Sequence, residues 1–147
     1  MLELMRMLFD KLLAELPQGT AKLNVYRVPN GDGTVVEIIP SNSKSASFGV
    51  HVNNGLNHVD FSSGQIGTWE LPLEGRYREP SAEQLVLEVE QMSRAVIAGN
   101  CDKTRLLFAT ISRIHVDGFT YKVVGLPMLP IPPFGTRKYA PFVSNPS

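Results

Sequence analysis

Two stretches of the chain repeat apolar residues at helical spacing. In residues 2–16 the apolar positions recur every three or four residues, and Pro17 ends the pattern. A second stretch begins at Ser81, whose hydroxyl can accept from the amide of Gln84 while the Gln84 side chain reaches back, which is a capping box. It ends at Gly99, a residue type that often terminates helices. The residues that these two helices are expected to bury are Met5, Leu8, Phe9, Leu12, Leu13, Leu16, Leu85, Val86, Val89, Met92, Val96 and Ile97.

Shorter stretches with alternating or β-branched residues predict strands. Residues 23–28 and 34–39 flank a turn rich in Gly, Asn and Asp, and they form a hairpin. A second hairpin covers residues 47–62, and a short strand covers residues 66–71. A last hairpin, residues 105–126, turns at the Asp-Gly dipeptide of positions 117 and 118, which is the two-residue type I′ signal. The predicted order is a helix, five strands, a helix and two strands.

These elements predict a single α+β domain over residues 1–126. We expect one antiparallel sheet of about seven strands, with both helices packed on one of its faces. The sheet should bury Phe48, Val50, Val59, Phe61, Ile114, Phe119 and Tyr121 beneath the helical residues Leu8, Leu12, Val89 and Met92.

Residues 127–147 have a different character, because they hold six of the eleven prolines. Such a segment cannot form a helix or a central strand. Apolar residues are interleaved with the prolines, and this is more apolar surface than a solvated linker carries. We therefore expect a Pro-rich extended C-terminal tail that is docked on the domain or on a symmetry mate.

The middle hairpin has one apolar face. If the Asn-Gly dipeptide of positions 54 and 55 is a two-residue turn, Val50 faces Val59 and Phe48 faces Phe61. A three-residue turn would instead mix polar and apolar residues on each face. The separation of the two faces favours the two-residue turn.

The opposite face of this hairpin would bring two histidines together. In the two-residue register His51 faces His58, and Asp60 lies opposite Gly49. Directly opposed residues have Cβ atoms ~5 Å apart, so both imidazoles could hold one metal ion that Asp60 joins or orients. Two histidines and a carboxylate are ligands that zinc and iron accept. The alternative is an ordinary polar face, since no compact motif such as HExxH is present.

The last hairpin also separates its residues into two faces. Ile114 and Tyr121 belong to the face expected in the core, while Arg113, His115 and Lys122 make a small basic patch on the other. This patch could bind a carboxylate, a phosphate or an acidic partner. Alternatively, it is a solvated face whose charges discourage pairing with another sheet edge.

Composition narrows the classes of partner. Fourteen Lys and Arg residues balance fourteen Asp and Glu residues, whereas domains that bind nucleic acid by neutralising phosphates show a basic excess. The only cysteine, Cys101, cannot form an internal disulfide, which fits a reducing compartment. No stretch approaches the ~20 apolar residues that span a bilayer. We therefore expect a cytoplasmic protein that binds neither nucleic acid nor a membrane.

The sequence favours a non-catalytic protein-interaction or binding module that needs no cofactor, because it lacks a Gly-rich phosphate loop, a nucleophile elbow and a CxxC pair. Apolar residues outside the predicted core, namely Leu4, Met7 and Leu87, could contact a protein partner or a second copy of the chain. The order of elements resembles that of small secretion chaperones and toxin-immunity proteins, and this resemblance implies an immunity- or chaperone-like role.

The alternative is a small hydrolase that depends on zinc or another divalent metal. Its ligands would be His51, His58 and Asp60, with His115 or Glu37 as a further ligand or base. This hypothesis requires the polar faces of the two hairpins to meet in one cleft.

Overall fold

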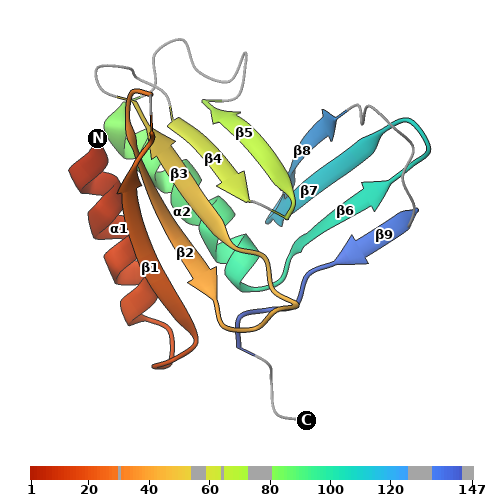
Figure 1. Ribbon diagram of the computed structural model, residues 1–147, viewed down its shortest axis with the longest axis horizontal. Helices are drawn as coiled ribbons and strands as arrows, with labels where there is room; N and C mark the ends of the chain where they lie inside the picture. Colours follow the sequence, from red (N-terminus) through yellow and green to blue (C-terminus); the bar gives the residue numbers. More distant parts are fainter. Residues whose placement is uncertain (30, 54–58, 64, 73–80, 126–133, 144–147) are drawn as a thin grey trace.

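The computed structural model describes residues 1–29, 31–53, 59–63, 65–72, 81–125 and 134–143. Within these residues the chain forms an α+β fold whose strands pair antiparallel in two sheets (Figure 1). The predicted fold class is therefore confirmed. The elements in chain order are α1 (Leu2–Ala14), β1 (Ala21–Arg27), β2 (Thr34–Pro40), β3 (Phe48–Val52), β4 (Val59–Ser63), β5 (Gly67–Leu71), α2 (Ala82–Ile97), β6 (Cys101–Arg105), β7 (Thr110–Val116), β8 (Phe119–Gly125) and β9 (Gly135–Lys138).

The number of strands and sheets differs from the prediction of one seven-stranded sheet. The first sheet has the order β1-β2-β3-β4-β5 and the second has the order β8-β7-β6-β9. The sequence did not indicate β6 or β9, because the segments Cys-Asp-Lys-Thr-Arg and Gly-Thr-Arg-Lys lack an apolar alternation. Backbone hydrogen bonds to neighbouring strands, which do not depend on side-chain pattern, hold both of them.

Both helices lie on the same face of the first sheet, and α2 also reaches β7 of the second (Figure 1). The predicted capping box starts α2, since the Gln84 amide donates to Ser81 Oγ at 3.2 Å and the Ser81 amide donates to Gln84 Oε1 at 2.9 Å. Gly99 follows the end of α2 with a φ of 79°, a conformation that suits glycine best.

The core lies between the helices and the first sheet and extends to the inner face of the second. Phe48 stacks on Phe61 with ring centroids 5.9 Å apart and meets Phe9 edge-on. Most of the predicted core residues of both sheets and helices are buried, whereas Leu13, Leu16, Val86 and Ile97 are only partly buried. Phe119 is 41% exposed, because it is the first residue of the edge strand β8, next to the turn; its ring meets that of Tyr121 edge-on.

The described part of the tail, residues 134–143, lies against the same chain. Strand β9 pairs with β6 at the edge of the second sheet. Beyond it, the Ala140 amide donates to the Lys44 carbonyl and the Phe142 amide donates to the Ile97 carbonyl, both at 2.9 Å. The Phe142 ring is buried 6.0 Å from that of Phe48. The tail residues 127–133 and 144–147 lie outside the described residues.

The two sheets meet along β5 and β8. The buried Ser112 hydroxyl of β7 donates to the carbonyl of Ile66, and a Cβ on Gly67 would lie 3.1 Å from the Val123 side chain. This close contact fixes the second sheet at an angle to the first (Figure 1). Among the described residues, no helix is long and apolar enough to cross a membrane.

Candidate functional site

Charge is divided unequally along the chain, although the whole chain is neutral. Residues 101–147 contain six Lys or Arg and two Asp, a net charge of +4, whereas residues 1–100 contain eight Lys or Arg and twelve Asp or Glu, a net charge of −4. The second sheet belongs entirely to the basic segment. The neutral overall composition therefore gave no sign that the second sheet belongs to a basic segment, which attracts acidic groups.

The predicted basic patch lies on the outer face of this second sheet. Arg113 faces Lys122 across β7 and β8, and His115 faces Thr120. The structure thus brings Arg113, His115 and Lys122 to one face, where Lys122 is exposed and, in the part of the chain that is described, has no ion pair.

Asp102 of β6, which sequence reasoning missed, occupies the centre of this patch. Arg113 Nη1 donates to Asp102 Oδ1 at 2.9 Å, and His115 Nε2 lies 2.7 Å from Asp102 Oδ2. Burial raises the pKa of Asp102, but the hydrogen bonds from His115 and Arg113 outweigh it and hold the pKa below its usual range. Two of the three predicted ligand-binding side chains, Arg113 and His115, are therefore already engaged by an internal carboxylate.

The carboxylate, imidazole and hydroxyl of this network lie in line, because His115 Nδ1 is 3.1 Å from Thr120 Oγ1. That order of groups activates hydroxyl nucleophiles in enzymes. Here Thr120 is exposed and the His115 side chain is 44% exposed, so water reaches both groups. The network is better suited to fixing the three strands than to chemistry that requires water exclusion.

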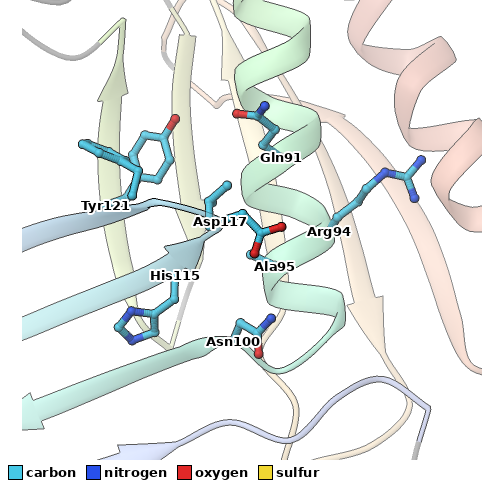
Figure 2. A pocket seen from close by; sticks show the side chains of 9 residues that line it. Gln91, Arg94, Ala95, Asn100, His115, Asp117 and Tyr121 are labelled. Atoms are coloured by element: carbon cyan, nitrogen blue, oxygen red, sulfur yellow. The ribbon is translucent and has the colours of Figure 1, made fainter.

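A cavity of about 450 Å³ lies between α2 and the end of the β7–β8 hairpin (Figure 2). His115 lines it, but the only guanidinium in its lining, that of Arg94, points away toward α1 (Figure 2). Arg94 is held there by Glu15 at 2.7 Å and Glu90 at 2.9 Å. This cavity therefore offers mainly uncharged polar groups and the Asp117 carboxylate.

A second cavity, of about 410 Å³, lies on the inner face of the second sheet; we call it the cationic cleft. It is lined by Gln65, Lys103, Arg105, Phe134, Gly135, Thr136, Arg137 and Tyr139. Lys103 lies directly opposite Arg137 in the β6–β9 pairing, and Arg105 is two residues further along β6 on the same face. Three cations therefore converge on one cavity, and no sequence signal pointed to them because both strands were missed.

The loop between β6 and β7 is the third feature of the second sheet; we call its residues Leu106, Leu107 and Phe108 the apolar tip. These side chains are 49%, 51% and 69% exposed. The Leu106 amide donates to the Ala109 carbonyl at 2.7 Å, which closes a tight turn with Leu107 and Phe108 between them. Figure 1 shows this turn at the end of the molecule farthest from α1.

The predicted histidine pairing is wrong in register. Val52 pairs with Val59 and Val50 with Phe61, so His51 faces Asp60 instead of His58. The observed register is shifted by two residues from the predicted one, which preserves the apolar face. Asp60 accordingly does not lie opposite Gly49.

His51 and Asp60 are neighbours on the outer face of the first sheet. His51 Nε2 lies 3.0 Å from the Asp32 carbonyl, which only accepts, so Nε2 carries a proton. His51 Nδ1 is 3.7 Å from Asp60 Oδ2. Glu37 lines the same cavity, but the described residues contain no group of three His, Cys, Asp or Glu that could hold a metal. His58 lies outside the described residues, and His115 belongs to the second sheet.

Cys101 is buried at the start of β6. Burial, together with the adjacent Asp102 carboxylate, raises the pKa of Cys101 to about 12. The thiol therefore stays protonated at neutral pH and is a poor nucleophile.

Comparison with known proteins found no matching family model, no similar curated protein and no similar solved structure. The function is therefore inferred from the geometry of this chain.

Proposed function

We propose that this protein is a non-catalytic protein-interaction module that docks on an acidic partner protein through the apolar tip. The observation that carries this proposal is the run of three consecutive exposed apolar residues, Leu106, Leu107 and Phe108, at a tight turn.

Turn chemistry makes this run unusual. Tight turns favour Gly, Asn and Asp, and the neighbouring β7–β8 hairpin follows the rule with Asp117 and Gly118. The apolar tip breaks it with Leu107 and Phe108, and aromatic residues exposed in this way are frequent binding hot spots. A local rule broken without a gain in folding stability points to a binding role.

The charge around the tip indicates the kind of partner. Arg105 precedes the apolar tip, and the segment that contains it has a net charge of +4. Charge complementarity steers such a surface toward an acidic partner and away from a basic one. The expected partner therefore presents an apolar pocket with acidic residues on its rim.

A comparative pull-down from the native cell lysate tests this proposal. The tagged full chain is compared with the double variant Leu107→Ser/Phe108→Ser and with the control Met7→Ser/Leu87→Ser, which removes exposed apolar residues from the helices. The proposal predicts a co-purifying acidic protein that the tip variant and 0.5 M NaCl release and the control retains. Equal recovery with both variants contradicts it.

Light scattering on the purified chain tests whether the partner is a second copy. A dimer that the tip variant dissociates would identify the acidic half of another molecule as the partner, since residues 1–100 carry a net charge of −4. A monomer at all concentrations assigns the tip to a different protein.

The metal-dependent hydrolase remains the second candidate, because His51 and Asp60 adjoin, with His51 Nδ1 3.7 Å from Asp60 Oδ2. Zinc titration of the purified chain tests it. Binding to the folded state should raise Tm as zinc increases, and His51→Ala should abolish the shift. An unchanged Tm at high zinc contradicts this candidate.

A further inference from the structure

The cationic cleft holds three positive charges that no described residue neutralises. Within the described residues, the Arg105 side chain has no hydrogen bond or ion pair, and the Arg137 guanidinium lies over the ring of Tyr139, 5.2 Å from its centroid. Lys103 Nζ reaches the Gln65 carbonyl at 3.5 Å. Neither contact supplies a formal negative charge.

Such an arrangement is unfavourable without an anion. Like charges directly opposite each other in a sheet destabilise the pairing, and Lys103 and Arg137 are direct partners. The outer face of the same strands shows the usual solution, because Asp102 neutralises Arg113 there. On the inner face, no described carboxylate neutralises Lys103, Arg105 or Arg137.

We propose that the cationic cleft binds a phosphomonoester, with the phosphoryl group between Lys103, Arg105 and Arg137 and the organic group against Phe134. This inference concerns the inner face of the second sheet and does not depend on the apolar tip or on its partner.

The chemistry of the lining selects this class of ligand. Guanidinium groups bind phosphoryl oxygens through paired hydrogen bonds, and a dianion offsets three cations better than a carboxylate does. The cavity of about 410 Å³ is larger than a phosphate group requires and falls in the range of small-molecule sites. Phe134 lines it and is 50% exposed, so an apolar group attached to the phosphate can pack against the Phe134 ring.

The wall opposite the strands is held in place. The Tyr139 hydroxyl donates to the Gln65 carbonyl at 2.9 Å, and the Gln65 side chain accepts from the amide and hydroxyl of Ser47 at 3.0 and 2.9 Å. Burial raises the pKa of Tyr139, so the hydroxyl remains neutral beside the anion. A rigid wall loses little conformational entropy when a ligand binds.

Isothermal titration calorimetry of the full chain with phenyl phosphate and inorganic phosphate tests the proposal. Both should bind saturably, phenyl phosphate more tightly, with a Kd of about 1 mM or below. Arg137→Gln and Lys103→Gln should each weaken binding about tenfold or more. Matched controls are Lys138→Gln and Lys122→Gln, which remove exposed cations from the outer face of the same sheet and should change Kd by less than about twofold.

Phe134→Ala separates the two parts of the site. It should reduce the affinity for phenyl phosphate to that for inorganic phosphate, whose own affinity should not change. Circular dichroism melting of each variant confirms folding. Should Arg137→Gln unfold, Arg137→Lys, which retains the charge but loses the paired guanidinium hydrogen bonds, should still weaken the binding of phenyl phosphate.

Several outcomes overturn the proposal. One is no saturable binding of phenyl phosphate, and another is an equal loss in the matched controls, which indicates general charge attraction. Benzoate binding as tightly as phenyl phosphate also refutes the choice of a phosphoryl group. The variant Leu107→Ser/Phe108→Ser should bind phenyl phosphate normally, so the failure of this inference and of the interaction proposal can be distinguished.

Discussion

The two sheets share antiparallel pairing but differ in cover and in charge. Two helices cover one face of the first sheet, and the apolar residues of β2 to β5 on that face are buried beneath them. In the second sheet, α2 contacts β7, while β9 is exposed along its whole length. The first sheet carries the packing that stabilises the fold, and the second is left with the charges and apolar residues that suit recognition.

Two adjacent residues of β6 show that the two faces of the second sheet differ in how their charges are neutralised. Asp102 and Lys103 point to opposite faces of the second sheet. The Asp102 carboxylate is satisfied by Arg113 and His115, whereas Lys103 is left among other cations. One face of the strand is thus neutralised by neighbouring side chains, and on the other face no described carboxylate offsets the charge of Lys103.

The largest expected effect tests the packing role of the first sheet. Phe61→Ala removes a fully buried ring that stacks on Phe48 and should lower the free energy of unfolding by about 3–5 kcal/mol. Phe108→Ala, at the exposed tip, should change it by less than about 0.5 kcal/mol. Urea unfolding measures both values, and a loss below about 1 kcal/mol for Phe61→Ala would overturn the comparison.

The next effect tests whether the tail belongs to the core of the first sheet. Phe142→Ala removes a buried ring in contact with Phe48 and should lower the free energy of unfolding by about 3 kcal/mol. The adjacent Val143 is exposed, so Val143→Ala should have little effect. Urea unfolding measures both losses. If Phe142→Ala and Val143→Ala lower the free energy of unfolding equally, the tail lies on the surface and does not belong to the core.

A smaller effect concerns the ion network of the second sheet. Asp102→Asn leaves Arg113 and His115 without their carboxylate and should lower the free energy of unfolding by about 1–2 kcal/mol at pH 7. Urea unfolding at several pH values measures it. Asp117→Asn is the control, because the Asp117 carboxylate is exposed and, among the described residues, has no ion pair.

The pH dependence of the same variant has a definite sign. Folding lowers the pKa of Asp102, so the stabilisation is complete above the unfolded value of about 3.9 and is lost as the pH falls through the folded value. The difference between the unmodified chain and Asp102→Asn should therefore persist from pH 7 to pH 5 and shrink below about pH 4. A difference that is constant down to pH 3 contradicts the role assigned to the carboxylate.

The smallest effect is expected for the exposed ion pairs of Arg94 on α2. Arg94 pairs with Glu15, the residue after α1, and with Glu90 of α2. Arg94→Gln should lower the unfolding free energy by less than Asp102→Asn does, and 1 M NaCl should reduce the difference because the groups are exposed. Arg6→Gln removes an exposed arginine with no ion pair among the described residues and serves as the control. Thermal unfolding at two salt concentrations measures both, and a salt-independent loss indicates packing instead.

Features encoded by neighbouring residues could be predicted from the sequence. The capping box at Ser81, the end of α2 at Gly99 and the two-residue turn at Asp117 and Gly118 depend on residues within one or two turns of each other. The exposed helical residues Leu4, Met7 and Leu87 were expected by the same periodicity and are exposed. The face on which Arg113, His115 and Lys122 lie followed from the alternation of the last hairpin.

The contacts that define the candidate sites could not be predicted. Asp102 joins Arg113 and His115 only because β6 pairs with β7, and β6 has no apolar alternation to reveal it. Lys103 and Arg137 are 34 residues apart in the chain and meet through the β6–β9 backbone pairing. Likewise, the register between β3 and β4 could not be predicted, since a shift of two residues preserves every face and changes every pair, including the partner of His51.

The sequence by itself therefore determined the helices, their ends, the hairpins and the face on which each hairpin residue lies, because periodicity and turn preferences act over short distances. Only the tertiary structure decided that the strands form two sheets, which residue faces which across them, and that three cations share one cleft. These features depend on backbone hydrogen bonds between distant segments, and such bonds form with almost any side chain and leave no pattern in the sequence.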